Sequence, residues 1–206
     1  MQKYLGESVT QLFHKGGPVM YPLLLASILG VAYIIYCLLI LRKRVVLPKV
    51  LTDLAETLTR AGDYVAAEAA CRREGGPFAD ILLATLAARD ANREDAEAMV
   101  EGAGRRAHHD LSHGTMMLEV IAGVAPLLGL LGTVSGMYTV FLNLQKAGVK
   151  DLGLISAGIA EALIATIAGL CVAIVTFVAY TFLSRRVEAL ILEMERHATG
   201  LLKRLR

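Results

Sequence analysis

Three long apolar stretches stand out along the chain. They run from about Val19 to Leu41, from Leu118 to Leu144 and from Leu152 to Leu183. A helix needs about 20 apolar residues to cross the roughly 30 Å hydrocarbon core of a bilayer, so each stretch is long enough to form a membrane span. Arg42-Lys43-Arg44 follows the first stretch where a signal peptide would have a cleavage site of small residues, which favours a retained span.

The basic residues that flank these stretches predict their orientation. One side carries the clusters Arg42-Lys43-Arg44, Arg105-Arg106 and Arg185-Arg186, and the other side carries Lys3, Lys15, Lys146 and Lys150. The richer side is expected to be cytoplasmic, which places the N-terminus outside and the C-terminus inside. The predicted segments are an outer N-terminal segment (1–18), a first transmembrane helix (19–41), a cytoplasmic helical domain (42–117), a second transmembrane helix (118–144), an outer loop (145–153), a third transmembrane helix (154–183) and a cytoplasmic C-terminal helix (184–206).

The segment between the first two spans alternates helical patterns with helix breakers. Gly62 and Gly75-Gly76 are stop signals, Pro77 suits a first helical turn and Asn92 is a candidate N-cap. After the third span, apolar residues from Val187 to Leu202 keep helical spacing, which predicts one long amphipathic helix. The predicted fold is an all-α membrane protein whose second and third transmembrane helices extend into a helical cytoplasmic domain.

Composition agrees with a membrane protein and excludes several other classes. The 206 residues are 55% hydrophobic and 19% charged, and 21 basic against 19 acidic residues give a net charge of +2. This balance lacks the basic excess of a dedicated nucleic-acid binder. Three scattered cysteines, at 37, 71 and 171, favour small buried side chains over a disulfide framework or a metal cluster. The sequence has no phosphate-binding loop, no HExxH motif and no nucleophile elbow, so hydrolytic chemistry within the chain is not expected.

Glu161 is the only charged residue deep within any of the three stretches. A carboxylate in hydrocarbon is costly, so such a residue usually faces a protein interior or an aqueous path, or is protonated. Glu161 lies about two turns from the outer start of its span, where the N-terminus of a helix would also favour negative charge. We favour a functional role, because aliphatic residues surround Glu161 and no Lys or Arg lies within helical reach.

Helical projection places Glu161 at the edge of a stripe of small residues. In the third span the stripe contains Gly158, Ala162, Ala165, Gly169 and Thr176, with Glu161 at one edge and Thr166 at the other. In the second span the matching face contains Ala122, Ala125, Gly129, Gly132, Thr133 and Gly136. Small residues let membrane helices approach closely, so helix packing explains the glycines and alanines. For Thr133 and Thr166, a hydroxyl bonded to its own helix and a hydroxyl lining a proton or cation path remain equal alternatives.

Two other groups carry weaker indications. His109 and His113 share a helix face, but two imidazoles without a third ligand are weak grounds for a metal site, and none is predicted. Glu119, at the inner mouth of the second span, is either a cytoplasmic proton exit or a boundary charge, and the boundary charge is favoured. Pro126 removes one backbone donor and predicts a kink in the second span.

The segments APLLGLLGTVSGM and GIAEALIATIAGLCVAI resemble the ExbB/TolQ branch of the MotA/TolQ/ExbB proton channel family. The resemblance covers nearly the whole chain and is most specific over 125–137 and 158–174. MotA itself is less similar, because it is longer and has four spans. The resemblance implies that Thr133, Glu161 and Thr166 form the proton pathway of the family.

The resemblance also implies an assembly and a location. It implies a homopentameric ring in the bacterial inner membrane, around the transmembrane helices of a small ExbD- or TolR-like subunit that brings an aspartate. The ring would act as a motor subunit, not an enzyme, with the proton as coupling ion and no cofactor, and would energise a TonB- or TolA-like protein.

Three alternatives stay open at this point. The short polar N-terminal segment favours an ExbB-like role in outer-membrane nutrient uptake over a TolQ-like role in envelope maintenance. A secondary transporter would predict a broken helix or inverted repeats, neither of which is clear in three spans. A structural membrane scaffold would predict that leucine can replace Glu161 without loss of function.

Overall fold

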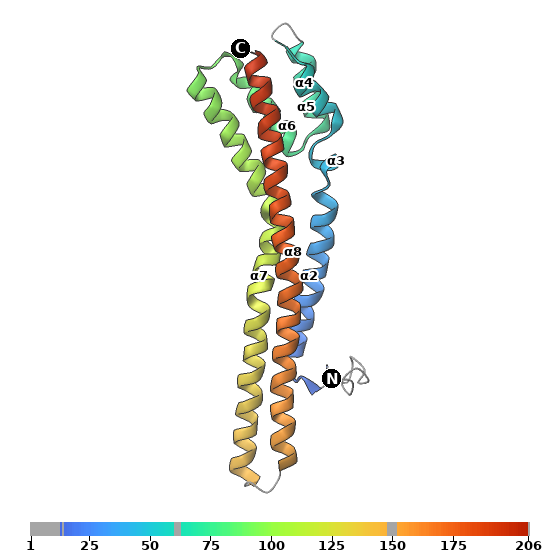
Figure 1. The fold of residues 1–206 in the computed structure, drawn as a ribbon, viewed down its shortest axis with the longest axis vertical. Coiled ribbons are helices and arrows are strands. Elements are labelled where there is room, and N and C mark those ends of the chain that lie inside the picture. Colours follow the sequence, from blue (N-terminus) through green and yellow to red (C-terminus); the bar gives the residue numbers. More distant parts are fainter. Residues whose placement is uncertain (1–12, 14, 60–62, 148–151, 206) are drawn as a thin grey trace. The chain divides into compact units, whose positions relative to one another are not determined.

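The chain is described by a computed structural model at residues 13, 15–59, 63–147 and 152–205. Figure 1 shows the fold. The described elements are α2 (Met20–Ile40), α3 (Lys43–Val46), α4 (Lys49–Thr57), α5 (Tyr64–Glu74), α6 (Gly76–Ala87), the 3₁₀ helix η1 (Ala88–Asp90), α7 (Arg93–Ala147) and α8 (Leu152–Leu205). The described residues contain no strand, so the predicted all-α class is confirmed.

Three helices are long and apolar enough to cross a membrane. They are α2, the apolar part of α7 within Arg93–Gln145 and the apolar part of α8 within Ile155–Leu205. Both α7 and α8 run far beyond these apolar parts, as predicted for the second and third helices. The helix of α7 is uninterrupted at Pro126.

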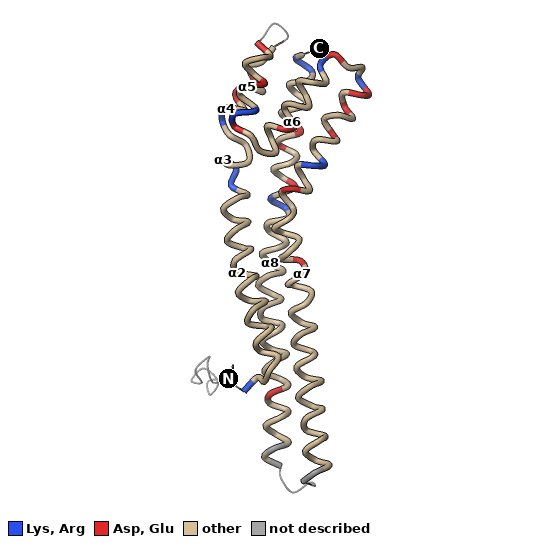
Figure 2. The backbone as a smooth tube through the Cα atoms, turned by 180° about the vertical axis from the view of Figure 1, so that it is seen from behind, with Lys and Arg blue, Asp and Glu red and all other residues tan. Residues whose placement is uncertain are grey.

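The chain divides into two compact units, which we describe separately. The first combines Met1–Ile34 with Met117–Tyr180, and the second combines Ile35–Met116 with Thr181–Arg206. The charged positions in Figure 2 gather on α4–α6 and on the parts of α7 and α8 that belong to the second unit.

In the second unit, short helices pack on the ends of α7 and α8. Its apolar core is fully buried and includes Leu51, Phe78, Ile81, Leu82, Leu86, Met194 and Leu201. The local sequence explains where the short helices begin and end. Gly75 has a φ of 65° between α5 and α6, Pro77 stands in the first turn of α6, and the Asn92 side chain accepts a hydrogen bond from the Asp95 N–H at 2.8 Å. These three predicted signals are confirmed, whereas Gly62 lies outside the described residues.

Polar contacts join α8 to the preceding elements of the second unit. The Arg186 side chain donates to the carbonyl of Leu41, just past the end of α2, at 3.1 Å. An ion pair of 2.5 Å joins Lys43 of α3 to Glu193. Because carbonyl groups at a helix C-terminus have no partner within the helix, Arg186 satisfies a group that α2 itself cannot. The second unit thus holds the C-terminal end of α2 against α8.

Candidate functional site

The candidate site lies in the first unit, where α7 and α8 run antiparallel with their small residues in contact. A Cβ built on Gly136 would lie 3.0 Å from Cβ of Ala162, and one built on Gly129 would lie 3.1 Å from the carbonyl oxygen of Ala165. A Cβ on Gly169 would lie 2.6 Å from the carbonyl oxygen of Ala125, so the two backbones nearly touch. All six of these residues are buried. Two further glycines take part in the same interface, since a Cβ on Gly132 would overlap Ala165 and one on Gly158 would overlap Val140.

The two threonine hydroxyls use different partners. The Thr166 hydroxyl donates across the helix interface to the Gly129 carbonyl at 3.2 Å. The Thr133 hydroxyl donates to the carbonyl of Leu130, within its own helix, at 2.6 Å. In the described part of the chain, neither hydroxyl is bonded to the Glu161 carboxylate. Thr166 therefore bridges α7 and α8, while Thr133 takes the local bond that threonines commonly form in helices.

Glu161 lies on α8 at the level where α7 and α8 meet through Gly136 and Ala162. Its side chain is half-buried, and its carboxylate lies against the turn that leads into α2. A Cβ built on Gly17 would overlap with Oε1 of Glu161. The same turn reaches both long helices, because Gly16 lies beside Ile164 and Val19 lies beside Gly132. Glu161 therefore lies on α8 beside the turn before α2, close to where that turn packs on α7.

The structure thus brings Glu161, Thr133 and Thr166 to one stretch of the α7–α8 interface without bonding them to one another. Glu161 and Thr166 are five residues apart on α8, which corresponds to about 7.5 Å along the helix axis. Protons cross such distances through intervening water or through a second acid. A site of this kind can hold one carboxylate in an apolar surrounding and can exchange a proton with a group that comes close to it.

Sequence reasoning missed Gly17 as a neighbour of Glu161. The signal was present in the run Gly16-Gly17-Pro18, because such glycine and proline combinations mark turns. A turn predicted from that run does not reveal which distant residue the turn contacts, and residue 161 lies about 140 residues further along the chain. Only the packing of the three segments places them together.

The weaker candidates lie elsewhere. Glu119 is exposed on α7. The rings of His109 and His113 are 6.2 Å apart and both residues are exposed. Among the described residues no group of three or more potential metal ligands comes together.

Large apolar side chains cover the outside of the three membrane-length helices. The most exposed include Tyr21 and Ile28 on α2, Leu127 and Tyr138 on α7 and Val178 on α8, each between 58% and 63% exposed. Such a surface is stable in contact with lipid or with other apolar helices and not in water. The fold and the site together define a multi-span helical membrane protein that carries one acid at a helix interface.

Comparison with known proteins places the chain within this class. Residues 74–196 match the model of the MotA/TolQ/ExbB proton channel family. A relative from Synechocystis, named biopolymer transport protein ExbB-like 1, is 36% identical over 179 residues, which are 83% of this chain and 68% of that protein. The chain belongs to the MotA/TolQ/ExbB proton channel family.

Other relatives match over shorter lengths. The biopolymer transport protein ExbB of Neisseria gonorrhoeae is 39% identical over 93 residues, which are 45% of this chain and 42% of that protein. The Tol-Pal system protein TolQ of Haemophilus influenzae is 38% identical over 109 residues, which are 50% of this chain and 48% of that protein. The chain thus spans less than half the length of these two relatives, and the predicted ExbB/TolQ branch is confirmed by their names.

Proposed function

We propose that this chain is the proton-channel stator subunit of a motor in the bacterial inner membrane, which energises a TonB- or TolA-like protein. One observation carries the proposal. Glu161 lies within the membrane-length part of α8, where α7, α8 and the turn before α2 come together. The match to the proton channel family includes both long helices around this acid.

The proposed assembly is a homopentameric ring around the helices of an ExbD- or TolR-like subunit. Two observations support it. The exposed apolar faces of α2, α7 and α8 exceed what one copy can bury, which suits contacts with lipid and with further copies. The sequence also has a single acid deep in its spans, so a relay between acids requires a second protein, whose helix would supply an aspartate.

In the proposed cycle, the aspartate of the small subunit is neutral in the dry interior of the ring and ionised beside Thr133, Glu161 and Thr166. Alternate protonation of the aspartate biases the rotation of the inner helices. The energy is sufficient for such a bias, because one charge that crosses 100 mV releases about 2.3 kcal/mol. The proton is the coupling ion, and the subunit itself catalyses no reaction and needs no cofactor.

An ExbB-like role in nutrient uptake is the version that we favour over a TolQ-like role. The length of the alignments does not separate the two roles, because the TolQ of Haemophilus influenzae aligns with 50% of the chain and the ExbB of Neisseria gonorrhoeae with 45%. The preference rests on the short polar N-terminal segment. The two roles differ in the partner protein and not in the chemistry of the site. Purification of the complex and identification of its small single-span subunit distinguish them.

Substitution of Glu161 tests the proposal in cells. We expect Glu161→Gln to abolish energy-dependent uptake or envelope function at normal expression, because glutamine keeps the shape of the side chain and removes the titratable group. Glu188→Gln, at an exposed position further along the same helix, is the matched control and retains function.

Two results would instead support the alternatives. Full function of Glu161→Gln and of Glu161→Leu would contradict the proposal and favour a structural scaffold. Uptake of a small solute by the chain reconstituted alone would favour a secondary transporter.

A further inference from the structure

The turn before α2 makes its closest approach to Glu161 at Gly17. Gly17 has a φ of 73°, a backbone conformation that residues with a Cβ rarely adopt. A Cβ at this position would overlap with Oε1 of Glu161 and would lie 2.8 Å from its carboxyl carbon. Two independent features, the backbone angle and the space taken by the carboxylate, therefore require glycine here.

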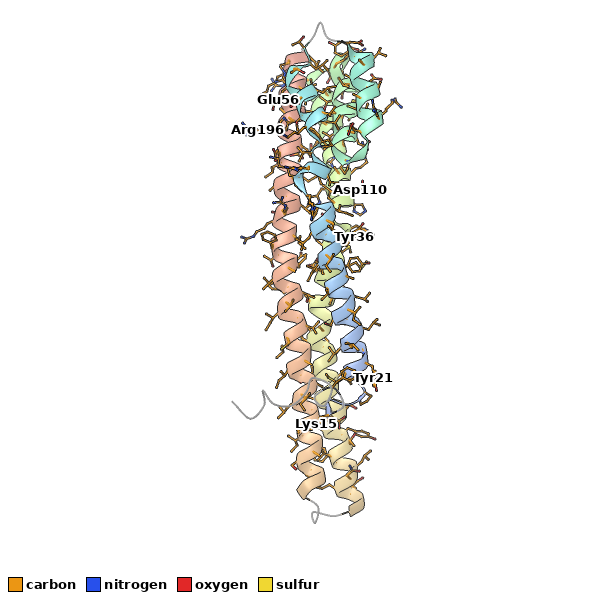
Figure 3. The ribbon with its side chains drawn as sticks, turned by 90° about the vertical axis from the view of Figure 1, so that its right-hand side faces the viewer. Lys15, Tyr21, Tyr36, Glu56, Asp110 and Arg196 are labelled. Carbon is orange, nitrogen blue, oxygen red and sulfur yellow. The ribbon has the colours of Figure 1, made fainter. Side chains whose placement is uncertain are left out.

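Hydrogen bonds and ring contacts hold this turn in place. The Gly16 N–H donates to the Phe13 carbonyl at 3.3 Å, and the Met20 N–H donates to the Gly17 carbonyl at 3.2 Å. The Phe13 ring meets the Tyr21 ring edge-on, with centroids 5.3 Å apart. Figure 3 shows Lys15 and Tyr21 at this end of α2. Because this turn is held at both ends, it can also hold the position of a side chain that packs on it.

The turn also rests on both long helices. Val19 is 9% exposed and, with Leu23, belongs to a core cluster that includes Ala125 of α7 and Ala173 of α8. The buried contacts of Val19 and Leu23 therefore hold the turn, and with it Gly17, against α7 and α8.

We infer that Gly17 is a positioning residue for Glu161: the backbone of the turn occupies one side of the carboxylate and so fixes where the carboxylate lies at the α7–α8 interface. The inference rests on the proposed function, because it concerns how Glu161 is held for proton transfer. Gly17 itself carries no proton. Because glycine has no Cβ, it leaves free the space that the Glu161 carboxylate occupies.

Gly16 provides a matched control in the same turn. A Cβ on Gly16 would lie 2.5 Å from Cγ and 2.6 Å from Sδ of the Met20 side chain and, at 3.2 Å, would meet a methyl group of Ile164. Its φ is not in the positive range, and the three atoms nearest to its Cβ would belong to Met20 and Ile164, not to Glu161. Gly16→Ala therefore adds the same methyl group without touching the acid.

The experiment compares proton flux into liposomes that contain the chain with the small subunit that co-purifies with it. We expect Gly17→Ala to lower the flux at least about tenfold, because a displacement of about 1 Å at a working group has effects of this order. We expect Gly16→Ala to stay within about twofold of the unsubstituted protein, since the Met20 side chain can move aside.

A double substitution separates positioning of the acid from a merely structural effect. In a Glu161→Asp background the carboxylate is one methylene shorter and withdraws from residue 17, so the added methyl group has space. In this background Gly17→Ala should lower the proton flux by less than about threefold. A smaller effect in one background than in the other is the non-additivity expected of residues in direct contact. If the flux of Glu161→Asp is too low to measure, the rate at which dicyclohexylcarbodiimide modifies residue 161 replaces flux in the same cycle.

Each outcome decides the inference. Normal proton flux in Gly17→Ala would overturn the inference. If Gly17→Ala lowers the flux by the same factor in the unsubstituted protein and in the Glu161→Asp background, the inference is also overturned, because the turn then has only a structural role. Normal flux in Glu161→Gln would overturn the proposed function together with this inference, whereas loss in Glu161→Gln with normal flux in Gly17→Ala would overturn the inference alone. If Gly17→Ala fails to accumulate in the membrane, Gly17→Asn takes its place, because asparagine tolerates a positive φ better and still carries a Cβ.

Discussion

At the scale of single residues, Glu161 combines a costly location with a specific set of neighbours. The sequence alone predicts that this acid is exceptional, because no other charged residue lies in the interior of the three apolar stretches. It could not predict the contact with Gly17, since that contact depends on the packing of segments far apart in the chain. It also left two alternatives for each threonine. The structure shows Thr133 bonded within its own helix and Thr166 bonded across the interface to α7, and the part of either hydroxyl in a proton path stays a prediction.

Cys71 offers a prediction at the same scale, in the second unit. It is fully buried, and burial raises the pKa of its thiol, with a smaller contribution from the negative charge of Glu68. A raised pKa lowers the thiolate fraction at a given pH, and the thiolate is the reactive form.

We therefore expect N-ethylmaleimide to modify Cys71 at pH 8 more slowly than an exposed thiol, because burial limits access to the sulfur and the raised pKa lowers the thiolate fraction. The rate should rise as the pH increases. Ala69→Cys, at an exposed position on the same helix, supplies the comparison, and mass spectrometry of the peptides measures both rates. Equal rates would show that α5 does not bury Cys71.

At the scale of elements, hydrophobic patterning predicted the three spans and the long continuation of α8, because lipid-facing and core-facing residues impose clear periods. Gly75, Pro77 and Asn92 also predicted the end of α5, the start of α6 and the start of α7, in that order. Hydrophobic patterning does not predict the register between α7 and α8. Small residues line both helices at several positions, and only their contacts show that Gly169 meets Ala125 while Gly136 meets Ala162.

The α7–α8 interface gives a prediction about packing. A methyl group on Gly169 would lie 2.6 Å from a backbone oxygen of α7, and a backbone cannot move aside as a side chain can. Gly169→Ala should therefore lower the free energy of unfolding in detergent by about 1–3 kcal/mol, the usual cost of overpacking. A Cβ on Gly123, an exposed glycine of α7, has no neighbour within 4 Å, so Gly123→Ala should be neutral or slightly stabilising. If the two variants unfold alike, the helices do not meet as described.

At the scale of the whole molecule, the chain combines a charged unit of short helices with long apolar helices that leave large side chains exposed. The family was predictable because its motifs lie in the two spans that carry the acid and the small-residue stripes. The orientation in the membrane and the number of copies in the ring stay predictions, because a single chain contains neither a bilayer nor its neighbours.

The most direct test of the central claim is the proton flux itself. The complex of this chain with its co-purifying small subunit is reconstituted into liposomes in sodium-free buffer, a membrane potential is imposed, and a pH-sensitive dye inside reports the rate of acidification. We predict acidification with the unsubstituted complex, none above empty liposomes with Glu161→Gln, and an unchanged rate with Glu188→Gln. Acidification by Glu161→Gln at the rate of the unsubstituted complex would contradict the claim that protons pass by Glu161.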